Sequence, residues 1–341
     1  MTEPQRIGQL FMLGLADDNV GAAERSAIAT WHFGSAWFTA QSSAGASSIG
    51  AVSRQLQALA TQRATGGVGF LVAANQEGGL IQALAGSGFE TIPSALVQGG
   101  MSPAALQVAA ARWALQLRAA GVNMNFAPVA DVVPPGTDAQ NAPIGQLQRE
   151  YGHDPATVRS RVFAFIRGMA QAGVATTVKH FPGLGRVQGN TDFTGAVSDT
   201  VTTLTDPYLE PFSGAITAGV PFVMVSLATY QRIDPARLAV FSPIVIGQLL
   251  RRDLHFTGVV ISDDLGAAAA VAAIPPATRA LDFLDAGGDM IISKTIGPAS
   301  QMARAIASRA ATDAPFRTLV DDAALRVLRA KEAEGLLPCG A

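Results

Sequence analysis

Two aspartates follow apolar stretches of the sequence in a way that suits catalytic carboxylates. Asp263 comes directly after the run GVVIS, and Asp192 ends the stretch KHFPGLGRVQGNTD. Two carboxylates that face one sugar, one attacking the anomeric carbon and one handling the leaving-group proton, are the minimal apparatus of a retaining glycosidase. An aspartate after a strand is as commonly a helix cap or a loop-fixing acceptor, and for Asp264 we favour that interpretation. Asp263 and Asp192 are the candidate catalytic pair.

Three further side chains have the chemistry to hold a neutral ligand rich in hydroxyl groups. Lys179 and His180 lie side by side at the end of an apolar run, and Arg149 follows a long loop. There they can donate charge-assisted hydrogen bonds to hydroxyls. The alternative is a lysine that reaches solvent and a histidine that bonds to the backbone. Asn75 and Asp131, each after another apolar run, complete the predicted substrate-binding set.

Metal and phosphate sites are not indicated by motif. The four histidines include no H-x-x-x-H or H-x-x-E arrangement, the spacings with which a helix presents metal ligands. The loop Gly183-Leu184-Gly185 lacks the third glycine and the lysine of a phosphate-binding loop. We therefore expect neither a metal nor a cofactor.

The elements that carry these residues alternate along the chain between apolar, β-branched runs and alanine-rich segments of helical spacing. The runs predict eight strands, at 10–14, 34–39, 69–74, 123–129, 175–180, 222–227, 258–262 and 290–293. The segments predict helices at 22–31, 46–62, 103–119, 155–172, 206–218, 243–252, 276–286 and 298–308. Strands without strict alternation are typical of a sheet covered on both faces. The pattern predicts an α/β fold, a (β/α)8 TIM-like barrel, with a doubly wound open sheet as the alternative.

The barrel is expected to account for the whole chain. An Ala-Gly pair precedes several predicted strands and repeats the helix-to-strand joint, and the segment 313–337 indicates a closing helix. We predict a single domain over residues 1–341, with a core of about 5–335 and a short tail, 336–341. The active site of such a barrel is built at the carboxyl ends of the strands, where the candidate residues lie.

Composition limits the class of ligand. Hydrophobic residues make up 49% of the chain and charged residues 15%, which suits a large buried core. The formal net charge of −2 gives no reason to expect nucleic acid or an anionic membrane as partner, so a small neutral carbohydrate fits better. The single cysteine, Cys339, allows no intrachain disulfide. Without a signal-peptide pattern or an apolar run of about 18 residues, we expect a cytoplasmic location, and the oligomeric state is not predicted.

Six motifs occur in the order IGQLFMLGL (7–15), NQEGG (75–79), FAPVADV (126–132), REYGHDP (149–155), KHFPGLG (179–185) and GVVISDDLG (258–266). From about residue 5 to about residue 310 the chain resembles glycoside hydrolase family 3, above all its single-barrel β-N-acetylglucosaminidases of the bacterial cell-wall-recycling type. The resemblance implies a TIM-like barrel and retaining, double-displacement hydrolysis of terminal β-linked N-acetylglucosamine without a cofactor. It implies that Asp263 is the nucleophile and that Arg149, Lys179 and His180 hold the sugar.

The sequence departs from this family at the general acid/base. After K-H-F-P-G the family has a histidine, and it later reads D-S-H, where the final histidine is the acid/base and the aspartate its partner. Here Leu184 replaces the first histidine, and Asn190, Thr191 and Asp192 replace D-S-H. The family's Asp–His dyad is therefore absent.

Other departures surround the predicted sugar pocket. Asn75 stands in place of the family's sugar-binding aspartate, Leu80 and Ala83 in place of two arginines, and Leu227 in place of a histidine. The run 146–148 before Arg149 is longer than the family pattern by about two residues.

Three hypotheses follow from this resemblance and its departures. In the first, the protein is an active glycosidase in which Asp192 serves as the acid/base, a step that most retaining glycosidases assign to a carboxyl group. In the second, it is an impaired member that binds glycans or cell-wall fragments, because losing a general acid/base costs on the order of 100-fold to 10,000-fold. The third is a glycan phosphorylase, in which Arg186 and Lys179 would supply charge for phosphate.

Overall fold

Eight parallel strands close into a barrel in this computed structural model, which describes residues 1–338. Their order around the barrel is β1-β13-β12-β9-β7-β6-β3-β2. The strands are β1 (Phe11–Leu15), β2 (Ser35–Phe38), β3 (Leu71–Ala74), β6 (Met124–Asn125), β7 (Ala175–Phe181), β9 (Phe222–Val225), β12 (Val259–Asp264) and β13 (Met290–Ser293). Each overlaps a predicted strand, and closure confirms the (β/α)8 barrel over the open sheet. Cys339 and the end of the predicted tail lie outside the described residues.

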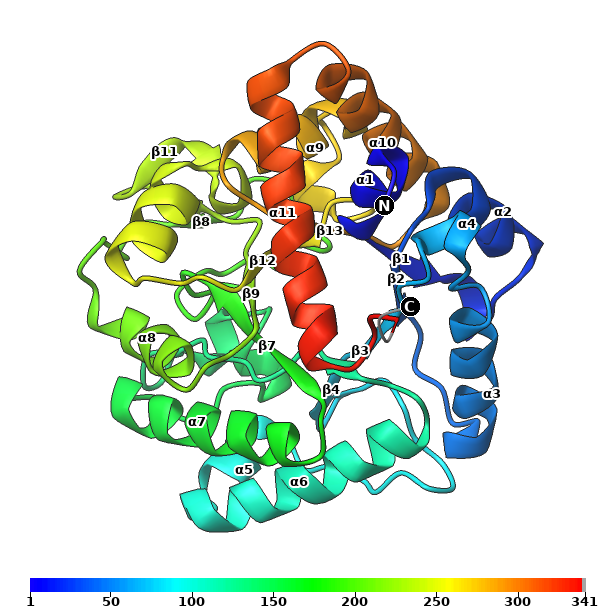
Figure 1. Ribbon diagram of the computed structural model, residues 1–341. Coiled ribbons are helices and arrows are strands. Elements are labelled where there is room, and N and C mark those ends of the chain that lie inside the picture. The colour runs from blue at the N-terminus through cyan, green and yellow to red at the C-terminus, as the bar shows by residue number, and fades with distance from the viewer. Residues whose placement is uncertain (339–341) are drawn as a thin grey trace.

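Helices surround the barrel, as Figure 1 shows. They are α1 (Glu3–Gln9), α2 (Ala22–Trp31), α3 (Gly45–Gln57), α4 (Gln62–Thr65), α5 (Ala95–Gly99), α6 (Pro103–Ala119), α7 (Pro155–Gln171), α8 (Glu210–Thr217), α9 (Pro276–Asp285), α10 (Ile296–Ala310) and α11 (Ala314–Ala333). Local signals set where they begin: the side chains of Ser102 and Asp154 cap α6 and α7, and a proline occupies the first turn of each. None of the helices within residues 1–338 is long and apolar enough to cross a bilayer.

Smaller elements extend the loops between strands and helices. The strands β4 (Gln76–Gly78) and β5 (Ile81–Gln82) pair antiparallel, and β8 (Ser198–Asp199), β10 (Thr229–Tyr230) and β11 (Asp234–Leu238) form a second small sheet. The short 3₁₀ helices are η1 (Ala16–Asp18), η2 (Asp138–Gln140), η3 (Gly145–Leu147), η4 (Pro207–Leu209), η5 (Ala239–Phe241) and η7 (Ala269–Val271). The segment η6 (Ile244–Asp253) is a π-helix where the sequence predicts an ordinary helix.

Several predicted elements are shorter than expected, and two of them show a local reason. The strand predicted over 123–129 is regular only at β6, because Pro128 has no N–H for the ladder, and a single bridge joins Val129 to Lys179. The helix predicted from residue 206 begins at Glu210 as α8. It follows the short helix η4, at whose start the Asp206 carboxylate accepts a hydrogen bond from Tyr208 N.

Alternate side chains of the strands fill the inside of the barrel. The interior cluster consists of Met12, Trp37, Leu71, Ala73, Met124, Phe126, Ala175, Phe222, Met224, Val259, Ile261, Met290 and Ile292, joined by Val327 of α11. Because strand side chains alternate with a period of two, the same inward row continues at the carboxyl ends to Lys179, Asp263 and Lys294. The barrel thus aims three charged side chains at one place.

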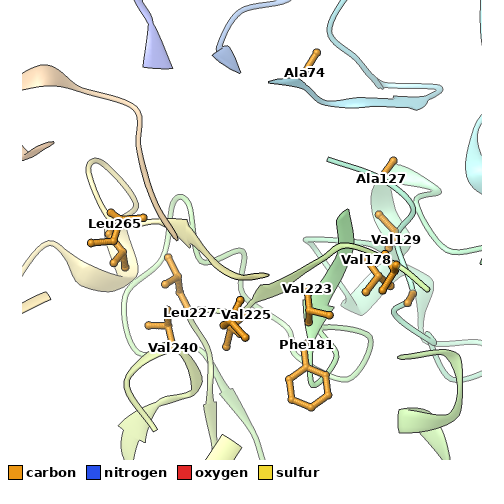
Figure 2. Packing of buried hydrophobic residues seen from close by; sticks show 14 of the residues in the cluster. Ala74, Ala127, Val129, Val178, Phe181, Val223, Val225, Leu227, Val240 and Leu265 are labelled. Carbon is orange, nitrogen blue, oxygen red and sulfur yellow. The ribbon is translucent and has the colours of Figure 1, made fainter. Parts of the chain in front are cut away.

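The outward side chains of the strands pack against the helices in a second, larger cluster. Figure 2 shows part of it, including Val178 and Val223, which are register partners on the neighbouring strands β7 and β9. Phe181 of β7 meets Phe212 of α8 edge to face, with ring centroids 5.3 Å apart. Truncating such a buried phenylalanine to alanine typically costs about 3–5 kcal/mol, so this packing fixes the strand end that carries Lys179 and His180.

The helix α11 lies across the amino end of the barrel (Figure 1). Its residue Lys331 is fully buried, and its Nζ donates to Gln9 Oε1 (2.6 Å), Gly34 O (2.6 Å) and Gly69 O (3.0 Å). The three acceptors lie within two residues of the starts of β1, β2 and β3. The closing helix predicted for 313–337 therefore seals the end of the barrel opposite the candidate residues.

Candidate active site

The carboxyl ends of the barrel strands surround a cavity of about 420 Å³, a volume typical of small-ligand sites. Its apolar lining includes Trp37, Phe126, Met224 and Ile292 of the interior cluster. Its polar lining contains six of the seven predicted site residues: Asn75, Arg149, Lys179, His180, Asp192 and Asp263. A larger hollow of about 600 Å³, lined by residues such as Arg237 and Asp285, contains none of the seven.

Glu77 joins two of the predicted cations. Its carboxylate accepts two hydrogen bonds from Arg149, from Nε and Nη2 at 2.8 Å each, and lies 2.6 Å from Lys179 Nζ. Lys179 also donates to Asn75 Oδ1 at 2.7 Å. The two cations hold the pKa of Glu77 at about 2 against the opposing effect of its burial, whereas burial lowers the pKa of Lys179 although Glu77 opposes this. The network fixes both cations at the cavity wall.

Asp131 lies behind His180, away from the cavity. It is fully buried; its Oδ2 is 2.8 Å from His180 Nδ1, and its Oδ1 accepts from the backbone N–H groups of His180 (3.1 Å) and Leu184 (2.9 Å). These contacts assign the proton to Nδ1 and leave Nε2, 3.5 Å from Arg149 Nη2, on the cavity side. The direct sugar contact predicted for Asp131 is therefore corrected to a positioning role, because its oxygens are already engaged.

Asp263 reaches the cavity from the end of β12. Its Oδ1 accepts a hydrogen bond from Asp264 N at 2.8 Å, and its side chain is partly exposed. Burial raises the pKa of Asp263, the charge of Asp192 raises it further, and His180 and Lys179 act in the opposite direction. The charge of Asp192 on the same cavity therefore favours the protonated form of Asp263.

The next aspartate, Asp264, shapes the turn that presents Asp263. Its Oδ1 accepts from Gly266 N (2.8 Å) and Lys294 N (2.9 Å). The loop-fixing role favoured from the sequence is confirmed.

Asp192 lies on an exposed loop that is held against the segment following Asp263. Its backbone oxygen accepts from Ala269 N (3.1 Å), and the oxygen of Thr191 accepts from Ala270 N (3.0 Å). Asn190 Oδ1 accepts from Asp192 N at 2.9 Å. The neighbouring Phe193 is 82% exposed at the rim of the cavity. These bonds tie the loop of one candidate carboxylate to the chain that carries the other.

Only some of the departures noted in the sequence line the cavity. Leu184 and Leu147 both line it, the second from the extra turn η3. Leu227 is fully buried, whereas Leu80 is 63% exposed. Leu184 and Leu147 therefore add apolar surface to the lining of the cavity.

Sequence reasoning missed two contributors to this site. Glu77 lies in the motif NQEGG. The predicted set contained two cations, Arg149 and Lys179, without an anion to pair with them, and this could have pointed to Glu77. Lys294, which lines the cavity, directly follows β13 and could have been found from its place at a strand end.

Comparisons with known proteins agree with this geometry. Residues 2–330 match the family model for the glycosyl hydrolase family 3 N terminal domain. A beta-hexosaminidase of Methylococcus capsulatus is 35% identical over 255 residues, 73% of this chain and 74% of that protein. A beta-hexosaminidase of Xanthomonas oryzae pv. oryzae is 32% identical over 83% of each chain.

Solved structures show the same relationship. The β-N-acetylhexosaminidase from Beutenbergia cavernae superposes with a TM-score of 0.96 at 46% identity, covering 97% of this chain and 99% of that one. A family 3 β-N-acetylglucosaminidase from Paenibacillus superposes with a TM-score of 0.87 at 27% identity, covering 100% of this chain and 64% of that one. With a family match that spans nearly its whole length, the chain belongs to glycosyl hydrolase family 3, a family of glycosidases.

Proposed function

We propose that this glycosidase hydrolyses terminal β-linked N-acetylhexosaminides, such as those of cell-wall fragments, with retention of configuration. One observation carries the proposal: Asp263 and Asp192 line a single cavity together with Arg149, Lys179 and His180. The names of the similar proteins, beta-hexosaminidase and β-N-acetylglucosaminidase, support the class of sugar.

The proposed reaction has two displacements. In the first, the Asp263 carboxylate attacks the anomeric carbon and the glycosidic bond breaks, while Asp192 gives its proton to the departing oxygen. In the second, Asp192 takes a proton from water, the water oxygen attacks the anomeric carbon, and the bond to Asp263 breaks. Asp192 is thereby protonated again, and the sugar leaves with its original configuration.

The chain's other polar groups have separate tasks in this scheme. Arg149 and Lys179 are fixed by Glu77, so they can bind sugar hydroxyls without losing much further side-chain freedom. His180 presents Nε2 to the cavity because Asp131 holds Nδ1. The loop of Asp192 is held against residues 269–270 by two backbone hydrogen bonds, which supports a fixed position for this short carboxylate.

The experiment compares wild type with Asp263→Ala and Asp192→Ala on an aryl β-N-acetylglucosaminide and an aryl β-glucoside. We expect Asp263→Ala to abolish aryl release, and Asp192→Ala to lose about 100-fold to 10,000-fold on a substrate with a poor leaving group. Azide should restore turnover to Asp192→Ala, because a small anion needs no general base. Asp253→Ala, an exposed aspartate outside the cavity, is the matched control and should behave as wild type.

Retention is tested by recording the anomer that first forms, by proton NMR. A β product supports the double displacement, and an α product refutes it. If wild type releases aryl groups no faster than Asp263→Ala on either sugar, the active-glycosidase proposal fails. Binding of N-acetylglucosamine by that inactive wild type would then support the impaired, glycan-binding alternative.

The phosphorylase hypothesis loses one of its two cations. Arg186 Nη1 lies 2.6 Å from Asp206 Oδ2 and 3.2 Å from Thr202 Oγ1, and its guanidinium stacks 3.8 Å from the centre of the Tyr208 ring. Arg186 lines a separate hollow, together with Asn141 and Gln188, and does not line the cavity that holds Asp263. Added phosphate is therefore expected to leave the rate of aryl release unchanged.

A further inference from the structure

Glu150 is a buried acid whose charge is not neutralised by the network described above. It is the sequence neighbour of Arg149, yet it points elsewhere: its exposed fraction is 0%, and neither carboxylate oxygen has a hydrogen-bond partner within residues 1–338. A buried carboxylate without partners is costly, because it has lost water and gained nothing in return.

Two other side chains with metal-binding chemistry surround this carboxylate. Asp138, on η2, and His153, just before α7, each place a ligand atom so that one atom from each of the three residues lies within 4.8 Å of the other two. His153 Nδ1 is 3.7 Å from Asp138 Oδ1 and 3.2 Å from the carbonyl oxygen of Val133. Asp138 Oδ1 is also shielded from solvent without a hydrogen-bond partner in the described chain. Asp138, Glu150 and His153 therefore converge, and within residues 1–338 three of the four carboxylate oxygens of Asp138 and Glu150 have no hydrogen-bond partner.

The arrangement calls for a positive charge between the two acids. Burial, helped by the nearby charge of Asp138, raises the pKa of Glu150 to about 7. A divalent cation would neutralise both carboxylates at once and accept lone pairs from oxygen and imidazole nitrogen. One histidine with two carboxylates is a ligand set typical of Zn²⁺ and similar transition-metal ions, whereas Mg²⁺ and Ca²⁺ prefer oxygen alone.

We propose that Asp138, Glu150 and His153 form a binding site for a divalent cation of the zinc class. The side chains of His153 and Asp138 are 35% and 39% exposed, which leaves a path for the ion and room for bound water. Glu150 supplies the buried wall of the site. The site is separate from the cavity, because none of its three residues lines that cavity.

The site closes the loop that carries Arg149. Asp138 lies near the start of that loop, and Glu150 and His153 lie at its end, so one ion would join both ends. Asn141 already anchors the middle by donating to Leu184 O and Val187 O at 2.7 Å each. The ion would hold Arg149 more firmly beside Glu77 and lower KM; this second effect rests on the proposed function, whereas the binding itself does not.

Zinc binding tests the proposal directly. The full chain, treated with chelator and dialysed, is titrated with Zn²⁺ by calorimetry, and thermal unfolding is followed with and without the ion. We expect wild type to bind Zn²⁺ and to unfold at a higher temperature with it. Glu150→Gln and His153→Gln should each weaken binding at least about tenfold and lose the thermal shift, since each removes one of three ligands.

Two controls assign the ion to this site. Glu90→Gln makes the same substitution in an exposed pair with Arg112 and should bind Zn²⁺ as wild type does. Asp263→Ala should also bind as wild type, because the proposed site is not the cavity. Because His153 is partly exposed, its variant provides the answer if Glu150→Gln does not fold.

Two results would overturn the proposal. If wild type binds no Zn²⁺, the buried Glu150 carboxyl is neutralised by a proton and not by a metal ion. If Glu150→Gln or His153→Gln binds Zn²⁺ as tightly as wild type, the ion lies elsewhere. Neither result touches aryl release, so failure here is distinguishable from failure of the glycosidase proposal.

Discussion

The chain contains three lysines, and two of them are buried at opposite ends of the barrel. Lys179 reaches inward from β7 at the carboxyl end, beside the cavity. Lys331 reaches inward from α11 at the amino end, where the barrel is sealed. Burial lowers the pKa of both, in the second case to about 7.

Their partners differ in charge. Lys179 pairs with the Glu77 carboxylate and shares it with Arg149. Lys331 donates to three neutral oxygens, those of Gln9, Gly34 and Gly69. At the carboxyl end the barrel maintains charges that can act on a ligand. At the amino end it uses one donor to satisfy polar atoms that closure would otherwise leave unpaired.

The comparison predicts that activity depends on the first end and stability on the second. Its strongest test is Glu77→Gln, which removes the anion that holds two buried cations. Breaking such a buried pair costs about 3–5 kcal/mol, so we expect kcat/KM for aryl release to fall at least about 100-fold. The control Glu90→Gln, in an exposed pair, should stay within about twofold of wild type.

Circular dichroism at the assay temperature shows whether Glu77→Gln is folded. A folded variant that keeps kcat/KM within threefold of wild type would mean that the Glu77 network is structural only, and the contrast between the two ends would disappear.

At the amino end, Lys331→Met should reduce stability without changing catalysis. The substitution removes the cost of burying the lysine, but it also leaves three oxygens without their donor, and we expect the second effect to be larger. The free energy of unfolding should fall by about 2–3 kcal/mol at pH 8. Urea denaturation measures it, and Lys294→Met, at an exposed lysine, should change stability by less than about 0.5 kcal/mol. A kcat/KM of folded Lys331→Met far below wild type would contradict the division of roles.

The pH dependence of this difference tests the charge of Lys331. Its pKa is about 7 in the folded chain against the ordinary 10.5, so between these values the unfolded state binds more protons and stability rises with pH. The free-energy cost of burying Lys331 is therefore largest below pH 7 and vanishes as the pH approaches 10.5. From pH 7 to pH 9, wild type should gain about 2 kcal/mol relative to Lys331→Met in urea unfolding. A difference that stays constant would show that the three oxygens keep the lysine charged.

Much of the fold was predictable from the sequence for local reasons. Strands such as β9 and β13 are short apolar runs, and helices such as α6 and α7 begin with a capping side chain and a proline. Because all strands are parallel, their carboxyl ends meet, and Asp263, Lys179 and His180 were expected together. These predictions depend only on local sequence and on the rule that the carboxyl ends of parallel strands lie at the same end of a barrel.

The pairing of charges was not predictable in this way. Glu77 and Arg149 are 72 positions apart, and nothing local says which acid neutralises which cation. Lys331 lies in a helix of mixed polarity and would be expected to face solvent; only the closing of α11 over the barrel buries it. Asp131 follows a strand as a ligand-binding residue would, and its role behind His180 depends on where Leu184 turns back.

The smallest expected effect on stability concerns the ion pair of Asp289 and Arg326 at the amino end of the barrel, because Asp289 also has a second arginine as partner. Asp289 is fully buried and lies 2.9 Å from Arg326 Nη1, but it also bonds to Arg251 and accepts from Val260 N at 2.7 Å. Arg326→Gln therefore leaves the carboxylate satisfied, and because the Arg326 side chain is 35% exposed, we expect a loss of at most about 1 kcal/mol in urea unfolding. Arg251→Gln, which removes the more buried partner, should cost more. Equal losses for the two variants would mean that Asp289 needs both arginines, and that the amino end, like the cavity, depends on a complete charge network.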